Sequence, residues 1–221
     1  MSKRLAFLHT VSGLVSIFSA LSDELVPGID RYHIVDESLL QNTIRADELS
    51  KNTVRNLYRY LIAAQDAGAD LVMVTCSTLG PAVEICRNMI NIPVMRVDEP
   101  MAELAVNEGK IIGVAATLKT TLEPTVALIN AEAEKQSKQI ETISSLCEGA
   151  FQAMLSGNTK THDTIVSSAL HELMKTTDVI VLAQASMARV VDTIPEEDRV
   201  VPILSSPRLA VEKLAEIFNG E

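Results

Sequence analysis

The chain has 221 residues and a formal net charge of −10. This acidic balance argues against nucleic acid as a partner, because no Lys/Arg cluster could offset repulsion from phosphates. Hydrophobic residues make up 47% of the chain and aromatic residues only 3%, so we expect a large aliphatic core with little to stack on bases or sugars.

The three cysteines are too few and too odd in number for a disulfide framework, which favours a reducing compartment, the cytoplasm. No apolar stretch reaches the roughly 20 unbroken residues that a membrane span needs, so we expect no membrane association. The apolar run that ends at Leu21 resembles a secretory signal, but polar residues such as His9 and Ser12 interrupt it. We interpret this run as a strand followed by a helix.

In the first half of the chain, short apolar strand patterns alternate with helical periodicity. We expect strands at Arg4–Leu8, Tyr32–Val35, Leu71–Val74 and Pro93–Arg96. We expect helices at Val11–Leu21, Ala46–Ala67, Ala82–Met89 and Pro100–Val106.

The second half repeats this alternation. We expect strands at Lys110–Ala115, Ile140–Ile143, Val179–Leu182 and Val200–Leu204. We expect helices at Leu122–Glu134, Leu146–Leu155, Thr161–Lys175 and Pro207–Phe218. Strands that alternate with helices over a whole chain predict an α/β fold with parallel sheets and right-handed crossovers.

Polar residues follow four of the expected strands, two in each half: His9-Thr10, Thr75–Thr78, Thr117–Thr121 and Gln184–Ser186. If the halves are related lobes that face one another, these junctions converge on one cleft, a common place for a small-molecule site. Ordinary helix capping by Ser and Thr explains any one of them. Helix capping explains less well why four expected strands are all followed by polar residues.

Cys76 lies at the second of these junctions, between a buried strand and a helix that Gly80-Pro81 opens. Backbone N–H groups at such a turn favour an anion, and the same field would lower the thiol pKa. The alternative is that Cys76 is a small buried core residue, as free cysteines often are.

Several segments resemble the aspartate/glutamate/hydantoin racemase superfamily, and most of all its hydantoin racemase branch. They are TCST at Thr75–Thr78, IPVMRVDEPM at Ile92–Met101, IIGVAATLKTTLEP at Ile111–Pro124 and VLAQASMA at Val181–Ala188. The resemblance implies two pseudo-twofold-related α/β lobes, each a short, mostly parallel sheet flanked by helices, with the active site in the cleft between them. The lobes are expected at residues 1–98 with 205–221 and at 99–204. The resemblance also implies no cofactor and a homo-oligomer.

In the family's racemases, two cysteines exchange protons on opposite faces of the substrate. The first matches Cys76, and the second falls on Gln184, an amide that does not trade protons near neutral pH. Cys86 lies one helix further on, and Cys147 lies in an expected helix, so neither replaces the second thiol. The resemblance implies that substrate-binding groups come from Thr10, Ser77, Thr78, Thr117, Thr120, Gln184 and Ser186.

His9 matches the place of an acidic residue near the first cysteine, so it is a candidate to pair with the Cys76 thiolate, although a packing or capping role is the alternative. No spacing of His33, His162 and His171 predicts a metal site. P-loop, GxGxxG and GxSxG motifs are absent from the sequence. Specificity is expected from two loops, Asp23–Arg31 and Gln41–Arg45.

The sequence therefore predicts a racemase-superfamily enzyme that acts beside a carboxylate or carbonyl of a small acid or cyclic amide, with Cys76 as its single catalytic thiol. Two alternatives stay open. One is a one-cysteine lyase, such as a decarboxylase, or a hydrolase of the same fold. The other is an inactive protein that binds a small acid.

Overall fold

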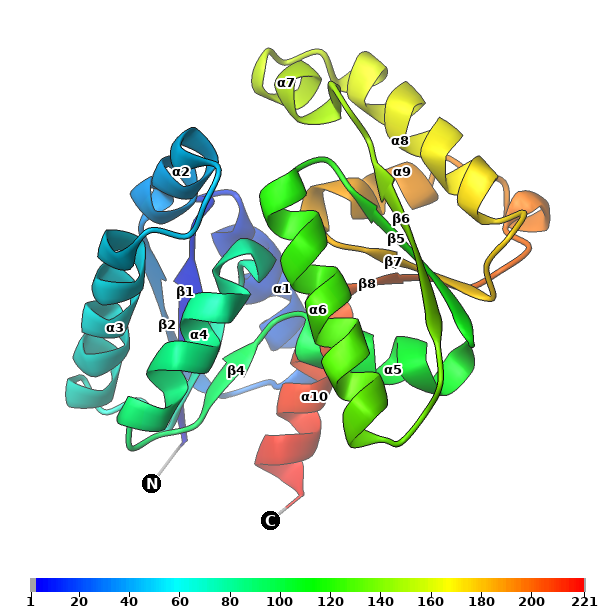
Figure 1. Cartoon of the computed structure of the whole chain (residues 1–221). Coiled ribbons are helices and arrows are strands. Elements are labelled where there is room, and N and C mark those ends of the chain that lie inside the picture. Colours follow the sequence, from blue (N-terminus) through cyan, green and yellow to red (C-terminus); the bar gives the residue numbers. More distant parts are fainter. Residues whose placement is uncertain (1–2, 221) are drawn as a thin grey trace. The chain divides into compact units, whose positions relative to one another are not determined.

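A computed structural model describes residues 3–220, which form two compact units. Unit 1 is Met1–Val97 with Pro207–Glu221, and unit 2 is Asp98–Ser206. Each unit holds one parallel four-stranded sheet flanked by helices (Figure 1). The predicted α/β fold is thus confirmed. Residues 1, 2 and 221 of the expected first lobe lie outside the described residues.

The sheet of unit 1 has the strand order β2-β1-β3-β4. Its strands are β1 (Arg4–His9), β2 (Asp30–Val35), β3 (Leu71–Val74) and β4 (Val94–Arg96). Its helices are α1 (Leu14–Leu25), α2 (Glu37–Ala46), α3 (Lys51–Asp66), α4 (Gly80–Cys86) and α10 (Ser206–Asn219). Two 3₁₀ turns flank α4, η1 (Ser77–Leu79) and η2 (Arg87–Met89).

Successive side chains of β1 and β3 enter two different hydrophobic clusters. Leu5 and Phe7 pack with residues of α1 and α10, whereas Ala6 and Leu8 pack with residues of α3 and α4. This is the two-residue period of a strand buried on both faces. The same alternation tells on which face of the sheet each side chain at a strand end lies.

The sheet of unit 2 has the order β6-β5-β7-β8, which is the order of unit 1 with each strand replaced by its counterpart four strands later. Its strands are β5 (Ile111–Ala116), β6 (Glu141–Leu146), β7 (Val179–Leu182) and β8 (Ile203–Ser205). Its helices are α5 (Glu99–Glu108), α6 (Lys119–Lys135), α7 (Ala150–Leu155), α8 (Thr159–Leu173) and α9 (Ala188–Val191). The 3₁₀ turns are η3 (Ala185–Met187) and η4 (Glu196–Asp198).

The helix predicted at residues 46–67 is confirmed over residues 51–66 as α3, but it begins too early, because residue 46 ends a separate helix, α2, that was not predicted. Helix α2 begins at the Asp36 cap and ends where Asp47 adopts a left-handed φ of 51°. The Ser50 side chain then accepts a hydrogen bond from the Thr53 N–H and starts α3. The predicted loop 41–45 is therefore helical.

The helix predicted at residues 146–155 also begins too early and is confirmed only over residues 150–155. Leu146 is the last residue of β6, and α7 begins only at Ala150, after Gly149 with its φ of 82°. A left-handed glycine separates strand from helix here. Cys147 accordingly lies at a strand end and not inside a helix.

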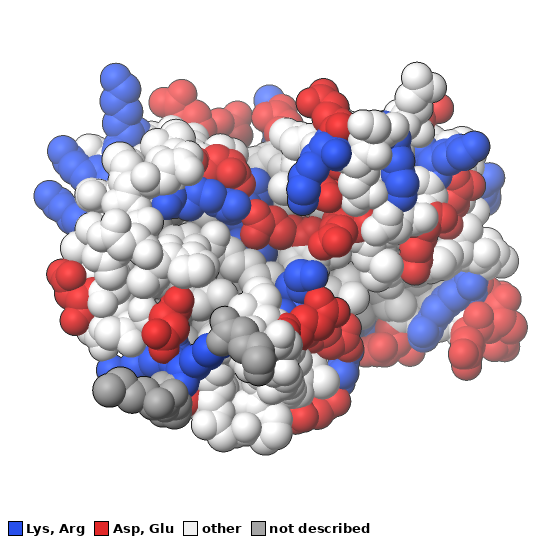
Figure 2. Space-filling view, turned by 90° about the horizontal axis from the view of Figure 1, so that it is seen from below, with Lys and Arg blue, Asp and Glu red and all other residues white. Residues whose placement is uncertain are grey.

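Within residues 3–220, no helix combines the length and the apolar character needed to cross a membrane. On the face that Figure 2 shows, acidic and basic side chains are interspersed and form no single basic field.

Candidate active site

Cys76 lies just beyond the carboxyl end of β3, in extended backbone that leads into η1 and α4. The residue is 8% exposed. Its sulfur is hydrogen-bonded by the hydroxyls of Thr10 and Thr78 and by the backbone N–H groups of Thr78 and Leu79. Two of the predicted binding residues, Thr10 and Thr78, are therefore neighbours of the thiol.

Burial raises the pKa of the Cys76 thiol, and the hydrogen bonds from Thr10, Leu79 and Thr78 oppose this without cancelling it. The predicted fall in the thiol pKa is therefore wrong. Desolvation penalises the thiolate more than the nearby donors stabilise it. The resting thiol is protonated, and the groups that would stabilise its anion are already in place.

Thr10, and not His9, is the partner of Cys76, and the register of the sheet explains why. Leu8 lies opposite Val74 in the parallel pair of β1 and β3. One residue further on, His9 is beside Thr75, and two residues on, Thr10 is beside Cys76. Because side chains alternate, the pair His9 and Thr75 faces α1, while Thr10 and Cys76 face α4.

His9 belongs to a buried chain of hydrogen bonds. Its Nδ1 lies 2.7 Å from Thr75 Oγ1, and its Nε2 lies 2.8 Å from His33 Nδ1. Thr75 donates its hydroxyl to the Leu8 carbonyl at 3.1 Å, so His9 donates from Nδ1 to Thr75 and accepts at Nε2 from His33. His33 Nε2 in turn lies 3.1 Å from Ser19 Oγ. The expected His9–Cys76 pair is wrong, because both ring nitrogens of His9 bond elsewhere.

Both imidazoles of this chain are neutral near pH 7. Burial, and then the neighbouring His33, lower the pKa of His9 from 6.5 to about 4. Burial, followed by the charge of Arg31, lowers the pKa of His33. The hydrogen bonds of this chain also require neutral rings. A second proton on His9 would occupy Nε2, the nitrogen that accepts the hydrogen bond from His33 Nδ1–H.

We predict that the free energy of unfolding falls as pH falls from about 6.5 to about 4. In this window the unfolded chain protonates His9 and the folded chain does not, so protons favour unfolding. The depressed pKa corresponds to about 3 kcal/mol. Urea unfolding across this range measures the loss, and His9→Asn should flatten the slope, whereas His171→Asn, at an exposed histidine of α8, should not. An equal slope in His9→Asn would contradict the assignment.

Gln184 and Thr117 are joined at the carboxyl edge of the unit 2 sheet. The side-chain oxygen of Gln184 accepts the backbone N–H of Thr117 at 2.6 Å and its hydroxyl at 2.9 Å. The two Thr117 donors that the resemblance assigns to a carboxylate therefore bind an amide oxygen of the protein itself. The NH₂ group of Gln184 is left to donate to a ligand oxygen.

The other two predicted residues of this unit lie near the same strand ends. Thr120 is in the first turn of α6, and its buried hydroxyl meets no hydrogen-bond partner in the part of the chain that the structure describes. Ser186 lies in η3, directly after Gln184 and Ala185, and is half-buried. In unit 1, the remaining predicted residue, Ser77, is buried at the start of η1.

Neither of the other cysteines is available as a second thiol. Cys147 follows β6, where its N–H donates to the Ala116 carbonyl at 2.7 Å, but its side chain packs in the apolar core of unit 2. Burial raises the pKa of Cys147 to about 11 and also raises the pKa of Cys86. Contrary to the prediction, Cys147 is not inside a helix. It differs from Cys76 in that burial alone shifts its pKa, whereas hydrogen-bond donors reach the Cys76 sulfur.

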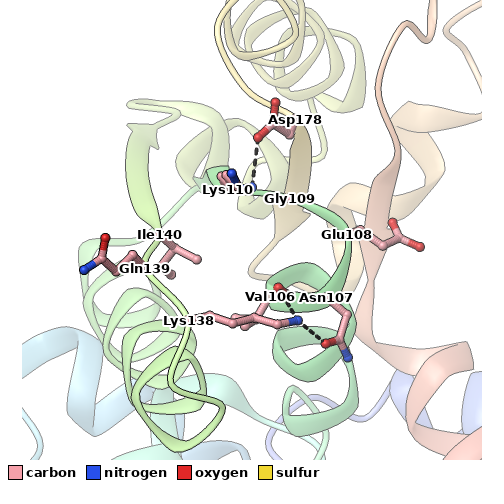
Figure 3. A pocket seen from close by; sticks show the side chains of 9 residues that line it. All are labelled: Val106, Asn107, Glu108, Gly109, Lys110, Lys138, Gln139, Ile140 and Asp178. Carbon is pink, nitrogen blue, oxygen red and sulfur yellow. Dashed lines mark hydrogen bonds between the residues drawn. The ribbon is translucent and has the colours of Figure 1, made fainter.

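A cavity of about 660 Å³ lies at the opposite, amino edge of the unit 2 sheet (Figure 3). Lys138 Nζ donates there to the Val106 carbonyl near the end of α5 and to the Asn107 side chain, and Asp178 accepts the N–H of Lys110. These contacts cap a helix and a strand. None of the predicted site residues lines this cavity. Residues 3–220 hold no group of three His, Cys, Asp or Glu side chains placed for a metal ion.

The fold and the thiol define an α/β protein with two like sheets and a cysteine at the carboxyl edge of the first. The sequence model of the Asp/Glu/hydantoin racemase family matches residues 10–214, and the chain belongs to this family. No curated protein sequence matches it.

Solved racemases share the fold at low sequence identity. A glutamate racemase from Bacillus anthracis is similar with a TM-score of 0.78 and 19% identity, over 99% of this chain and 82% of that one. An allantoin racemase from Klebsiella pneumoniae gives 0.71 and 17%, over 99% and 88%. An aspartate racemase homologue from Pyrococcus horikoshii gives 0.68 and 15%, over 99% and 100%.

Proposed function

We propose that this protein is a cofactor-independent enzyme that acts on the carbon beside a carboxylate or carbonyl of a small acid or hydantoin-like compound, with Cys76 as its single catalytic thiol. The observation that carries the proposal is the set of donors around the Cys76 sulfur. Thr10, Thr78 and Leu79 direct hydroxyl and N–H groups at an atom that becomes negative only when it gives up its proton.

The proposed chemistry follows from the raised thiol pKa. When the substrate loses a leaving group such as CO₂, the electrons of the broken bond stay on carbon as a carbanion or enolate, and the protonated thiol gives its proton to that carbon, so the S–H bond breaks as the C–H bond forms. The thiolate that remains accepts hydrogen bonds from the waiting donors, which were fixed before the reaction. Water returns a proton to sulfur and completes the cycle.

A one-cysteine lyase is the second candidate, and the Gln184 amide is the observation that favours it. Removal of a proton by Cys76 requires a thiolate, which burial disfavours. Loss of CO₂ from a substituted malonate produces an enolate without any base, and one protonated thiol is then sufficient. The Gln184 amide, which stands where the resemblance places a second thiol, is no second proton carrier. In unit 1, hydroxyls such as that of Ser77 would hold ligand oxygens.

Incubation of the protein in deuterium oxide with amino acids, hydantoins and substituted malonates tests this proposal. We expect deuterium to enter product from one face only, as read by NMR and chiral chromatography. Conversion of both enantiomers into each other would contradict the single-thiol mechanism. Tight binding of small acids with no exchange and no turnover would instead identify an inactive binding protein.

A further inference from the structure

Arg96 is a buried cation near the Cys76 turn to which the proposed chemistry assigns no role. It is the last residue of β4, opposite Val74, and is 5% exposed. By strand alternation its side chain lies on the same face of the sheet as Cys76. Its guanidinium Nη1 pairs with Glu84 of α4 at 3.3 Å, so the charged group lies against that helix.

Gly80 leaves the space that this guanidinium occupies. A Cβ atom on Gly80 would lie 2.3 Å from Arg96 Nη2 and 2.4 Å from its Cζ, closer than real side chains come. The backbone of Gly80 is ordinary helix, with φ −48° and ψ −51°. An added Cβ at this position would therefore force the Arg96 guanidinium to move, although the dihedral angles themselves suit any residue.

The same turn holds the donors of the thiol. Gly80 directly follows Leu79, whose N–H donates to the Cys76 carbonyl at 3.0 Å and also contributes a hydrogen bond to the Cys76 sulfur. We propose that Arg96 is a positioning residue: its guanidinium, seated against Gly80, fixes the turn Ser77–Gly80 and so holds the Thr78 and Leu79 N–H groups on the Cys76 sulfur.

Arg96 acts here through position and not through its field. The hydrogen bonds that lower the pKa of Cys76 come from Thr10, Leu79 and Thr78, and the last two residues lie on the turn that Arg96 contacts at Gly80. A lysine would keep the charge but not the planar group that fits against Gly80. The inference rests on the proposed function only in taking Cys76 as the reactive thiol.

The pH profile of alkylation tests this inference, because it needs no substrate. The protein is treated with iodoacetamide over a range of pH, and modification of Cys76, Cys86 and Cys147 is quantified separately by peptide mass spectrometry. In Arg96→Met and in Gly80→Ala, we expect the thiolate fraction of Cys76 at a given pH to fall about threefold to tenfold. The midpoint of the pH profile of Cys76 alkylation therefore moves to higher pH. The double variant should move no further, since both changes remove one contact.

Two control variants distinguish this positioning role from a general loss of packing around α4 and from an effect of the positive charge of Arg96. Arg87→Met removes another arginine that pairs with Glu84, at 3.1 Å, and should leave the Cys76 midpoint unchanged. Arg96→Lys should behave like Arg96→Met. An unchanged Cys76 midpoint in Gly80→Ala, a shift shared by all three cysteines, or full rescue by Arg96→Lys would each overturn the inference. Such a failure would leave the proposed function standing, and an inactive wild-type protein would leave the alkylation result intact.

Discussion

Cys76→Ser is expected to lower the turnover of any substrate by about 100-fold to 10,000-fold, the range found when a general acid is lost. A serine hydroxyl fits among the donors of Thr10, Thr78 and Leu79, but it holds its proton far more tightly than a thiol does. Because the change is nearly isosteric, substrate affinity should change much less than turnover. Steady-state kinetics and a separate binding measurement give the two quantities.

Cys86→Ser is the matched control, because it makes the same chemical change at a buried thiol of α4 whose nearest polar partner is the Val54 carbonyl, 3.7 Å away. This variant should keep nearly full turnover if it folds. Retained turnover in Cys76→Ser, or an equal loss in both variants, would remove Cys76 from the mechanism.

Gln184→Cys is expected to add interconversion of enantiomers to the proposed single-thiol chemistry. The change restores a thiol where the family's racemases carry their second one, and it also removes the oxygen that binds the Thr117 N–H and hydroxyl. Those two donors become free to hold a carboxylate. Deuterium should then enter from both faces, which chiral chromatography in deuterium oxide detects.

Gln184→Ser separates these two effects, because it frees the Thr117 donors without adding a thiol. It should change ligand binding and produce no interconversion. If the serine and cysteine variants gain the same activity, the released donors are responsible. If neither interconverts enantiomers, Gln184 does not occupy the place of a second proton carrier.

The strands were the most predictable part of the fold. Leu71–Val74 and Val179–Leu182 were predicted to the residue, because short apolar runs buried on both faces carry a strong local signal. Helix boundaries were less predictable. The break at Asp47 and the turn at Gly149 depend on left-handed backbone that the hydrophobic pattern does not record.

In the candidate site, the sequence placed Cys76 and Thr10 at two strand ends, whose adjacency the structure shows, but paired the thiol with His9. Once the parallel register is known, counting from Leu8 opposite Val74 assigns His9 to Thr75. His33 was missed as a functional neighbour, although it lies on the strand beside His9. Arg96 was missed because a basic residue at the end of a strand usually reaches solvent.

The sequence by itself determined the α/β alternation, the polar strand ends and the resemblance that identifies Cys76, since each depends on local residue patterns. Only the tertiary structure decided the state of that thiol. Its pKa depends on how completely the chain removes the sulfur from water and on which donors reach it, and residues far apart in the sequence set both. The same reason applies to Gln184, whose bond to Thr117 joins two strand ends 67 residues apart.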